Sequence, residues 1–326
     1  MQIERRALYN LLRMNWLQDP SMEVEPWQIE DYREMSFKAL FDRLKDKNIR
    51  LDRSNFLSLA ESYDTPEDLS EEFLDDADPT TQDQIYLLIF ELWRRLITEK
   101  PSLSIFCDEL DHQIHLYDSS PNPNTEAIQD IIANFQVILD ENADQGGNPQ
   151  EIFTSICAGC ANDIDSFLYD FIAEQIDNHN DSYAMELLDG FSKYVTDAKW
   201  FEFLRARLMA STDLEGANRY LRQILQNYSQ ADDLEFNLEV LSFLVAGGEQ
   251  ELFVNLAKKT ANLVAEEDDF QDLLLICADY YHRLDEDHKE QAIQEILKER
   301  SKTKQLNDPI SPQDAHFALL DQIISG

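Results

Sequence analysis

Apolar side chains recur along this chain at the three- and four-residue spacing of amphipathic helices. One face of the first segment carries five residues at this spacing: Leu8, Leu11, Leu12, Asn15 and Trp16. We expect that face to be the buried side of a helix. Alternation of apolar and polar positions, the pattern of a half-buried strand, is rare in the chain. The pattern therefore predicts an all-α protein.

Capping residues mark where several of these helices begin. A Ser, Thr or Asp stands directly before an apolar-periodic run at five positions: Ser36, Asp52, Thr65, Asp78 and Ser102, with Ser104 as an alternative to the last. The side chains of these residues accept hydrogen bonds from the first free backbone N–H groups of a helix. The most apolar run, Ile85 to Ile97, follows one of these caps, and we expect it to be a central helix.

Two polar segments interrupt the periodic pattern. Residues 119–124 form a loop rich in Ser, Pro and Asn, and residues 144–149 contain Gly146, Gly147 and Pro149. We place a domain boundary at the second segment. The chain then divides into 1–147, which reads as a helical bundle, and 148–326, which reads as a helical-repeat domain.

Periodic segments of the C-terminal half come in pairs. Turns at Thr212–Asp213 and Gly247–Gly248 separate the two members of successive pairs, which are spaced by about 40 residues. A third and more divergent pair follows, with Leu273–Arg283 and Gln291–Leu297 as its members. Stacked helix pairs of this length are typical of α-solenoids.

The best of these pairs resembles a known repeat family. Phe201–Tyr228 resembles a tetratricopeptide repeat, with Ala217 and Leu221 at the small and bulky positions of the second helix. Arg205 departs from the pattern, because the family has a small residue there, and no Pro closes the unit. The resemblance implies a right-handed α-solenoid in the C-terminal half.

Two segments of the N-terminal half carry a second resemblance. Phe90–Arg95 and Phe106–Asp111 are similar to segments of uncharacterised acidic helical proteins from chlamydia-type bacteria. This resemblance implies a bacterial cytosolic or secretion-linked protein and points to no activity.

The charge of the chain limits its partners. There are 65 acidic and 27 basic residues, a formal net charge of −38, and the acids are spread along the apolar-periodic segments. Such a body repels nucleic acid and anionic membranes and attracts basic proteins. Whether the excess serves binding, solubility or adaptation to high salt stays open at this point. With no long apolar stretch, no signal-peptide pattern and only four cysteines, we expect a cytoplasmic protein.

One loop has the spacing of a calcium site. Asp140, Asn142, Asp144 and Glu151 stand at positions 1, 3, 5 and 12 of an EF-hand-like segment between two predicted helices. Gln145 occupies the position of the glycine that makes the sharp turn of an EF-hand. We therefore expect a polar linker that does not bind Ca²⁺ at micromolar concentrations.

Another predicted helix gathers acids and imidazoles. Glu109-x-x-His112 matches the Glu-x-x-His element of di-iron bundles, and His112 with His115 could contribute two ligands to zinc. A second such element and further ligands are missing from the sequence pattern. We expect a solvated or hydrogen-bonded helix face here.

The spacing of two cysteines could indicate either a redox or metal-binding motif or buried packing residues. Cys157 and Cys160 form a C-x-x-C pair, but no strand precedes them, and Cys107 and Cys277 are far away in the sequence. We expect these thiols to be buried packing residues.

Together these features favour a non-enzymatic protein–protein interaction module, such as a scaffold, adaptor or chaperone. Its acidic helical-repeat surface would bind a basic or amphipathic partner, without a cofactor, and exposed aromatic residues would anchor that partner. The candidate anchors, chosen for their polar sequence neighbours, are Trp27, Tyr32 and Trp200. Two alternatives remain: a DNA-mimic protein that occupies a basic site, and a metal-dependent enzyme centred on Glu109-x-x-His112. The oligomeric state is left open.

Overall fold

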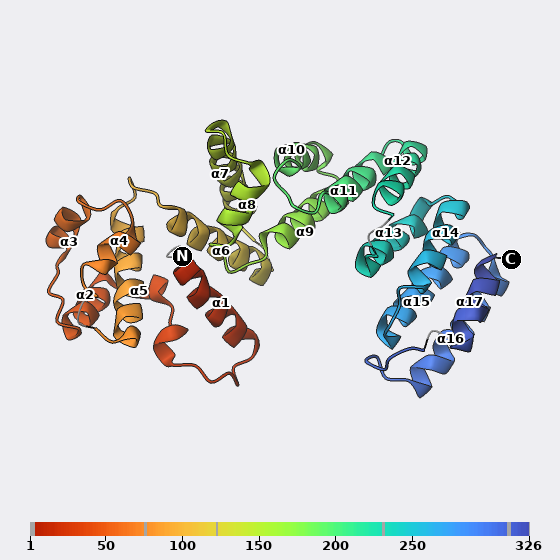
Figure 1. The fold of residues 1–326 in the computed structure, drawn as a ribbon, viewed down its shortest axis with the longest axis horizontal. Coiled ribbons are helices and arrows are strands. Elements are labelled where there is room, and N and C mark those ends of the chain that lie inside the picture. Colours follow the sequence, from red (N-terminus) through yellow and green to blue (C-terminus); the bar gives the residue numbers. More distant parts are fainter. Residues whose placement is uncertain (1–3, 75–76, 122, 230–231, 312–313, 326) are drawn as a thin grey trace. The chain divides into compact units, whose positions relative to one another are not determined.

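A computed structural model describes residues 4–74, 77–121, 123–229, 232–311 and 314–325 of the chain. Within these ranges the chain is helical and contains no strand, which confirms the predicted all-α class (Figure 1). It forms two compact units. The N-terminal unit comprises Met1–Leu168 with Lys193–Thr196, and the C-terminal unit comprises Tyr169–Ser192 with Asp197–Gly326.

The helices of the N-terminal unit are α1 (Glu4–Gln18), the short 3₁₀ helices η1 (Pro26–Gln28) and η2 (Tyr32–Glu34), α2 (Phe37–Asp46), α3 (Arg53–Ala60), α4 (Pro66–Glu71), α5 (Pro79–Leu96), α6 (Leu103–Ser119), α7 (Thr125–Asp144) and α8 (Pro149–Cys157). Helix α9 (Ile164–Asp177) crosses from one unit into the other. The C-terminal unit contains α10 (Asp181–Phe191), α11 (Ala198–Ala210), α12 (Leu214–Asn227), α13 (Leu234–Gly247), α14 (Gln250–Ala261), α15 (Glu267–Arg283), α16 (Asp287–Thr303) and α17 (Ala315–Ser325).

The two units meet in the sequence inside α9, between Leu168 and Tyr169. The segment at 144–149, where the sequence places a domain boundary, instead connects α7 to α8 within the N-terminal unit, and these two helices pack on each other. A polar, glycine-containing connection therefore marks a turn between packed helices here.

Capping side chains begin the helices of the N-terminal unit as the sequence predicts. Each of the five residues accepts a hydrogen bond from the backbone N–H three residues later: Ser36, Asp52, Thr65, Asp78 and Ser102. Because Ser102 caps α6, the alternative Ser104 lies inside the helix, where its hydroxyl group donates to the Glu67 carboxylate. These helix starts are thus fixed by local chemistry.

Helix α5 forms the centre of the N-terminal unit. Every residue from Ile85 to Trp93 is buried, including the charged Glu91. A helix that is apolar on all sides requires neighbours on all sides, and α2, α4 and η2 supply them. The prediction of a central helix in this run is confirmed.

Helix α1 exposes the face that the sequence pattern predicts to be buried. Leu8 is 60% exposed and Leu11 is 41% exposed, whereas Ala7 and Tyr9 are buried. The expectation that the leucine face is the buried one is therefore wrong. The arginine side of α1 faces the unit instead, for reasons given with the site below.

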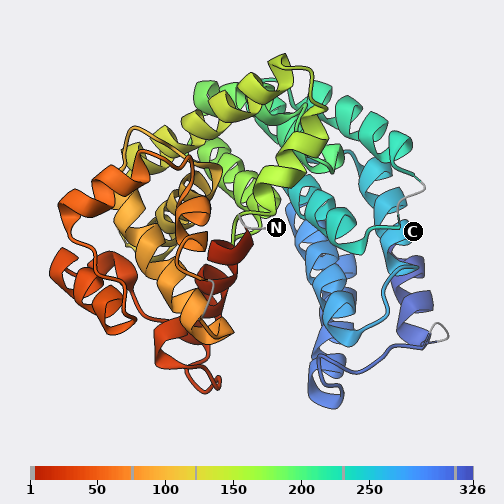
Figure 2. The same ribbon diagram turned by 60° about the vertical axis from the view of Figure 1, so that its left-hand side comes forward.

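Paired helices make up most of the C-terminal unit. Contacts join α11 to α12, α13 to α14 and α15 to α16, and Figure 2 shows α15 and α16 running side by side. A buried amide joins the first two pairs: Asn218 on α12 donates to the Gly247 carbonyl group (3.2 Å) and accepts from the Glu249 N–H group (3.3 Å). The helices of these three predicted pairs are thereby confirmed as elements.

A buried ion pair holds the last three helices of this unit. Arg300 on α16, only 2% exposed, donates to both carboxylate oxygens of Glu267 at the start of α15, and also to Asp314 just before α17 (3.0 Å). The guanidinium carbon lies 4.8 Å from the centre of the Phe270 ring. Charge, hydrogen bonding and stacking therefore converge on one side chain in a dry core.

None of the helices in the described ranges combines the length and the apolar character needed to cross a lipid bilayer.

Candidate functional site

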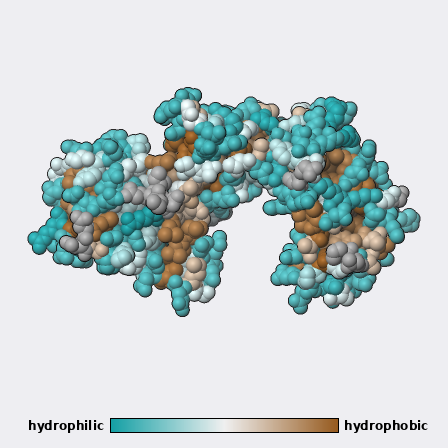
Figure 3. All heavy atoms as spheres, viewed as in Figure 1, coloured by the Kyte–Doolittle hydropathy of each residue, from teal (hydrophilic) through white to brown (hydrophobic). Residues whose placement is uncertain are grey.

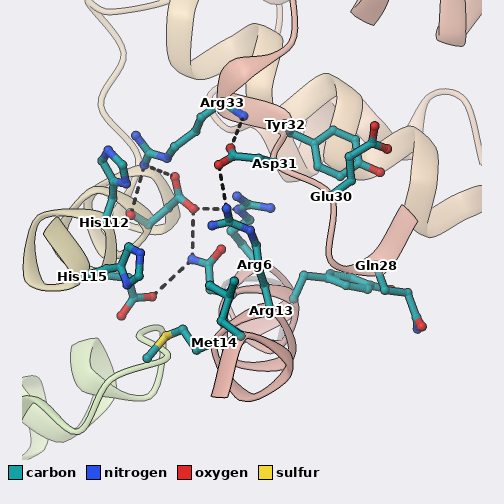
Figure 4. A pocket seen from close by; sticks show the side chains of 15 residues that line it. Arg6, Arg13, Met14, Gln28, Glu30, Asp31, Tyr32, Arg33, His112 and His115 are labelled. Atoms are coloured by element: carbon teal, nitrogen blue, oxygen red, sulfur yellow. Dashed lines mark hydrogen bonds and ion pairs between the residues drawn. The ribbon is translucent and has the colours of Figure 1, made fainter. Parts of the chain in front are cut away.

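A small polar pocket lies in the N-terminal unit between α1, the segment that carries η1 and η2, and α6 (Figure 4). Its volume is about 50 Å³, which is room for a few water molecules. Guanidinium, carboxylate and imidazole groups line it. Figure 4 shows His112 and His115 on one side of the pocket and Gln28 and Glu30 on the other.

The charges of this pocket follow from an asymmetry in the sequence. From Pro101 to Ser192 the chain contains no Lys or Arg. The buried carboxylates of α6 can therefore be neutralised only by bases from distant segments, because a buried charge without a partner is strongly unfavourable. Arg6 on α1 and Arg33 on η2 fill this role.

Asp108 is the centre of the network. Its carboxylate accepts hydrogen bonds from Arg6 Nε (2.7 Å) and Asn10 Nδ2 (3.0 Å), and it forms an ion pair with Arg33. Burial by itself raises the pKa of this carboxyl group. The two guanidinium groups outweigh burial and hold the pKa of Asp108 well below its ordinary value. Asp108 is thus a permanent negative charge that fixes α1 and η2 on α6.

Asp111, one turn further along α6, is satisfied by backbone groups. It accepts from the N–H groups of Ala161 (2.8 Å) and Asn162 (3.0 Å), in the connection between α8 and α9. Burial raises the pKa of Asp111 in spite of these hydrogen bonds, because no basic side chain of the described residues forms an ion pair with it. This residue ties α6 to the end of α8.

The predicted metal-ligand candidates lie beside this network. Glu109 accepts from Arg33 Nη1 (3.0 Å) and from Gln113 Nε2 (2.8 Å). Burial, and then the nearby Arg33, lowers the pKa of His112, so its imidazole is neutral at pH 7. His115 is partly exposed at the rim.

This arrangement does not suit a cation. Within the described residues, no group of three or more His, Cys, Asp or Glu side chains could hold a metal ion. The guanidinium groups of Arg6, Arg13 and Arg33 line the pocket and would repel a metal, and the carboxylates that could attract one are engaged with bases or backbone N–H groups. The charged groups instead hold helices together. We call Asp108, Arg6 and Arg33 the Asp108 cluster.

The Asp108 cluster, together with the other arginine contacts of α1, explains the orientation of this helix. Arg5 and Arg6 lie over the rings of Tyr86 and Phe90 of α5, and Arg13 Nη2 binds Asp31 (2.7 Å). Because the arginine side of the helix is held in this way, its leucine side is left outward. Figure 3 shows apolar atoms gathering over α1 on this face of the molecule.

The EF-hand-like segment has a different shape from the predicted loop. Helix α7 extends to Asp144, so Asp140, Asn142 and Asp144 lie on its last turns. Asp140 accepts hydrogen bonds from Lys193 Nζ (2.9 Å) and from the hydroxyl group of Tyr194, while Asn142 donates to the Ile138 carbonyl group. Residues 140–144 of the expected polar linker are therefore helical. Glu151 is an exposed residue in the first turn of α8.

The three candidate aromatic anchors differ in exposure. Tyr32 is 3% exposed and donates to the Trp27 carbonyl group (3.1 Å), so the exposure expected of it is wrong. Trp27 is half-buried, with its ring 5.6 Å from that of Tyr9. Trp200 is also half-buried, between Tyr169 and Phe236 at ring distances of 5.1 and 5.0 Å.

The surface of the C-terminal unit carries a feature that sequence reasoning missed. Five exposed residues of α15 follow one another at spacings of four and three, which places them in a single line: Asp268, Asp272, Leu275, Asp279 and His282. We call this line the α15 stripe. Leu275, at its centre, is 50% exposed. The spacing was visible in the sequence, but which side of α15 faces outward was not.

The carboxylates of the α15 stripe are not neutralised. Among the described residues, no ion pair involves Asp268, Asp272 or Asp279. Partial burial, and then the neighbouring Asp268, raises the pKa of Asp272, while burial together with Glu266, Asp268 and Asp272 raises that of Asp269. Carboxylates that repel one another in this way favour binding of a positive charge.

Comparison of the chain with protein-family models, with curated proteins and with solved structures gives no match. The resemblances to tetratricopeptide repeats and to acidic helical proteins of chlamydia-type bacteria therefore stay predictions.

Proposed function

We propose that this chain is a non-enzymatic protein–protein interaction module whose C-terminal unit binds a basic, amphipathic segment of a partner protein. The α15 stripe carries this proposal. It combines unneutralised carboxylates with a half-exposed leucine, and a helix that presents Lys or Arg beside an apolar residue complements both features. A cytoplasmic scaffold, adaptor or chaperone without a cofactor would act in this way.

The packing of the C-terminal unit supports a solenoid of tetratricopeptide-like pairs. The first helices of successive pairs contact one another, α11 with α13 and α13 with α15, in addition to the contacts within each pair. Gly247 lies where an added Cβ would be 2.8 Å from Leu214 Cδ2, so adjacent pairs approach closely. Stacked pairs of this kind present extended surfaces to partner segments.

The N-terminal unit supports a non-enzymatic role by its chemistry. The carboxylates Asp108 and Asp111 in the pocket hold helices together and are fully hydrogen-bonded. Neither carboxylate therefore offers the free lone pair that a general base needs, and a pocket of about 50 Å³ leaves little room for a substrate.

Binding of a synthetic peptide tests the proposal. The probe is a fluorescent helical peptide that carries Lys residues on either side of a Leu along one face, and fluorescence anisotropy follows its binding to the full chain. We expect binding that weakens as salt rises, whereas a scrambled peptide of the same composition binds poorly because it lacks an apolar face. Equal binding of the two peptides would show charge attraction without a specific surface.

Variants locate the site on the chain. Leu275→Ala should weaken binding about tenfold, equivalent to ~1.4 kcal/mol. Asp272→Asn and Asp279→Asn should each weaken it about two- to fivefold, because exposed charge pairs contribute less. Glu295→Gln on α16 removes one exposed carboxylate outside the α15 stripe and serves as the matched control. If all four variants bind like the unmodified chain, the α15 stripe is not the binding surface.

A further inference from the structure

Two thiols from distant parts of the N-terminal unit meet beneath the end of α8. Cys107 on α6 and Cys160, just after α8, both donate to the carbonyl oxygen of Ile156, with sulfur–oxygen distances of 3.6 and 3.8 Å. Cys107 is fully buried, whereas Cys160 is partly exposed.

The backbone around this pair is held from two sides. The N–H group of Cys160 donates to the Cys157 carbonyl group (2.9 Å), which closes a turn at the end of α8. The next residue, Ala161, donates to Asp111, which lies one turn after Cys107 on α6. The same helix thus positions one thiol and anchors the segment that carries the other.

We propose that Cys107 and Cys160 are a disulfide-forming pair, which a peroxide oxidises to a covalent link between α6 and the α8–α9 connection. The Cys160 thiolate attacks one peroxide oxygen and the O–O bond breaks. This gives a sulfenic acid, and the released hydroxide takes up a proton to become water. The Cys107 sulfur then attacks the Cys160 sulfur, the S–O bond breaks, and the departing hydroxide takes the Cys107 proton to form a second water.

Cys157 is the competing partner. It is three residues from Cys160 at the end of the same helix, in the spacing of a C-x-x-C motif. However, the sulfurs of Cys160 and Cys107 both lie within hydrogen-bond distance of the same Ile156 carbonyl oxygen. This shared acceptor favours the long-range pair. The neighbouring Cys107 side chain, and then burial, raises the pKa of Cys160, so the reaction is slow at neutral pH and needs excess peroxide.

Peptide mapping of the full chain tests the pairing. The chain is treated with hydrogen peroxide, its remaining thiols are alkylated, and it is cleaved after Glu. Cleavage at Glu99, Glu109, Glu151 and Glu174 places Cys107 on residues 100–109 and both Cys157 and Cys160 on residues 152–174. We expect a cross-linked pair of these peptides that lacks two hydrogen atoms and separates on reduction with dithiothreitol. Fragmentation of the longer peptide should assign the link to Cys160.

Four variants make the test decisive. Cys157→Ser and Cys277→Ser should keep the link, because neither residue belongs to the pair, whereas Cys107→Ser and Cys160→Ser should abolish it. The oxidised chain should also melt at a higher temperature than the reduced chain, and this difference should be lost in Cys160→Ser. If Cys107→Ser fails to fold, Cys160→Ser still decides, since its side chain is partly exposed. A link between Cys157 and Cys160, or alkylation of every cysteine after peroxide, would overturn the proposal.

Discussion

Both units of the molecule contain a buried carboxylate that is bound by an arginine from a distant segment, Asp108 in the N-terminal unit and Glu267 in the C-terminal unit. Asp108 binds Arg6 and Arg33, whose side chains stay 11% and 13% exposed at the edge of a small pocket. Glu267 binds the single guanidinium group of Arg300, and both side chains are almost completely buried. We call the Asp108 cluster wet, because it borders the pocket, and the Glu267 cluster dry, because both of its side chains are enclosed.

The two clusters leave their helices in different states. In the C-terminal unit the ion pair adds to a core in which α15 and α16 already bury apolar faces, with Phe270, Leu274 and Ile293 fully enclosed. In the N-terminal unit α1 contributes Ala7 and Tyr9 to the core, while the cluster holds its arginine side and Leu8 and Leu11 face outward. The amphipathic pattern of α1 shows which of its faces is apolar. The position of the carboxylates that bind its arginines decides which face is buried.

The largest effect is expected at the dry cluster. Arg300→Met leaves Glu267 buried without a cation, which should lower the free energy of unfolding of the C-terminal unit by about 3–5 kcal/mol. Hydrogen exchange of α15 and α16 amides measures this loss. Adding Glu267→Met should restore most of the stability, because the charge that lacked a partner is then gone. If the single variant is as stable as the unmodified chain, the pair is not buried as described.

A smaller effect is expected at the wet cluster. Asp108→Asn removes the charge that binds Arg6 and Arg33, and we expect a loss of about 2 kcal/mol, since both arginines can recover water. Amides of α1 should exchange faster, while those of α15 keep their rates. Asp83→Asn, which weakens the more exposed Arg5 contact, is the matched control and should cost less. Unchanged exchange in α1 would contradict the role given to Asp108.

Lowering the pH should weaken the Asp108 cluster. The folded-state pKa of Asp108 lies below the unfolded value of about 3.9, so its contribution is complete above about pH 4 and is lost as the pH falls through the folded-state pKa. Glu109, whose pKa is also lowered, acts in the same sense. Asp111 has a raised pKa and partly offsets the loss. Exchange of α1 amides measured from pH 6 downward should accelerate more steeply in the unmodified chain than in Asp108→Asn.

The smallest effect is expected on the outward face of α1. Leu8→Ala and Leu11→Ala should each change the free energy of unfolding by no more than about 0.5 kcal/mol, because neither side chain is enclosed. Leu40→Ala on α2, where the leucine is fully buried, should cost about 2–5 kcal/mol in the same denaturation experiment. A loss at Leu8 as large as that at Leu40 would mean that another surface covers α1.

Local signals in the sequence were sufficient for the helices themselves. N-capping by Ser36 or Thr65 depends on atoms within three residues, so the chain encodes it directly. The run from Ile85 to Trp93 is apolar on all sides and has only one stable environment, a core.

Features that depend on a distant partner could not be inferred from the sequence. The segment around Asp140 has the residue spacing of a calcium-binding loop. In the structure Asp140 lies on the last turns of α7, and its carboxylate accepts hydrogen bonds from Lys193 and Tyr194. Cys107 looks unpaired in sequence, and only the packing of α6 against α8 brings it to Cys160.

The sequence by itself determined the all-α class, the helix starts and the acidic character of this protein, because these follow from local hydrogen bonding, periodicity and composition. Tertiary structure decided which face of α1 is buried and which side of α15 carries an exposed leucine among carboxylates. The physical reason is the range of the interactions. Arg6 and Asp108 are 102 residues apart in the chain, and a charge pair forms only after folding has brought both groups out of water together.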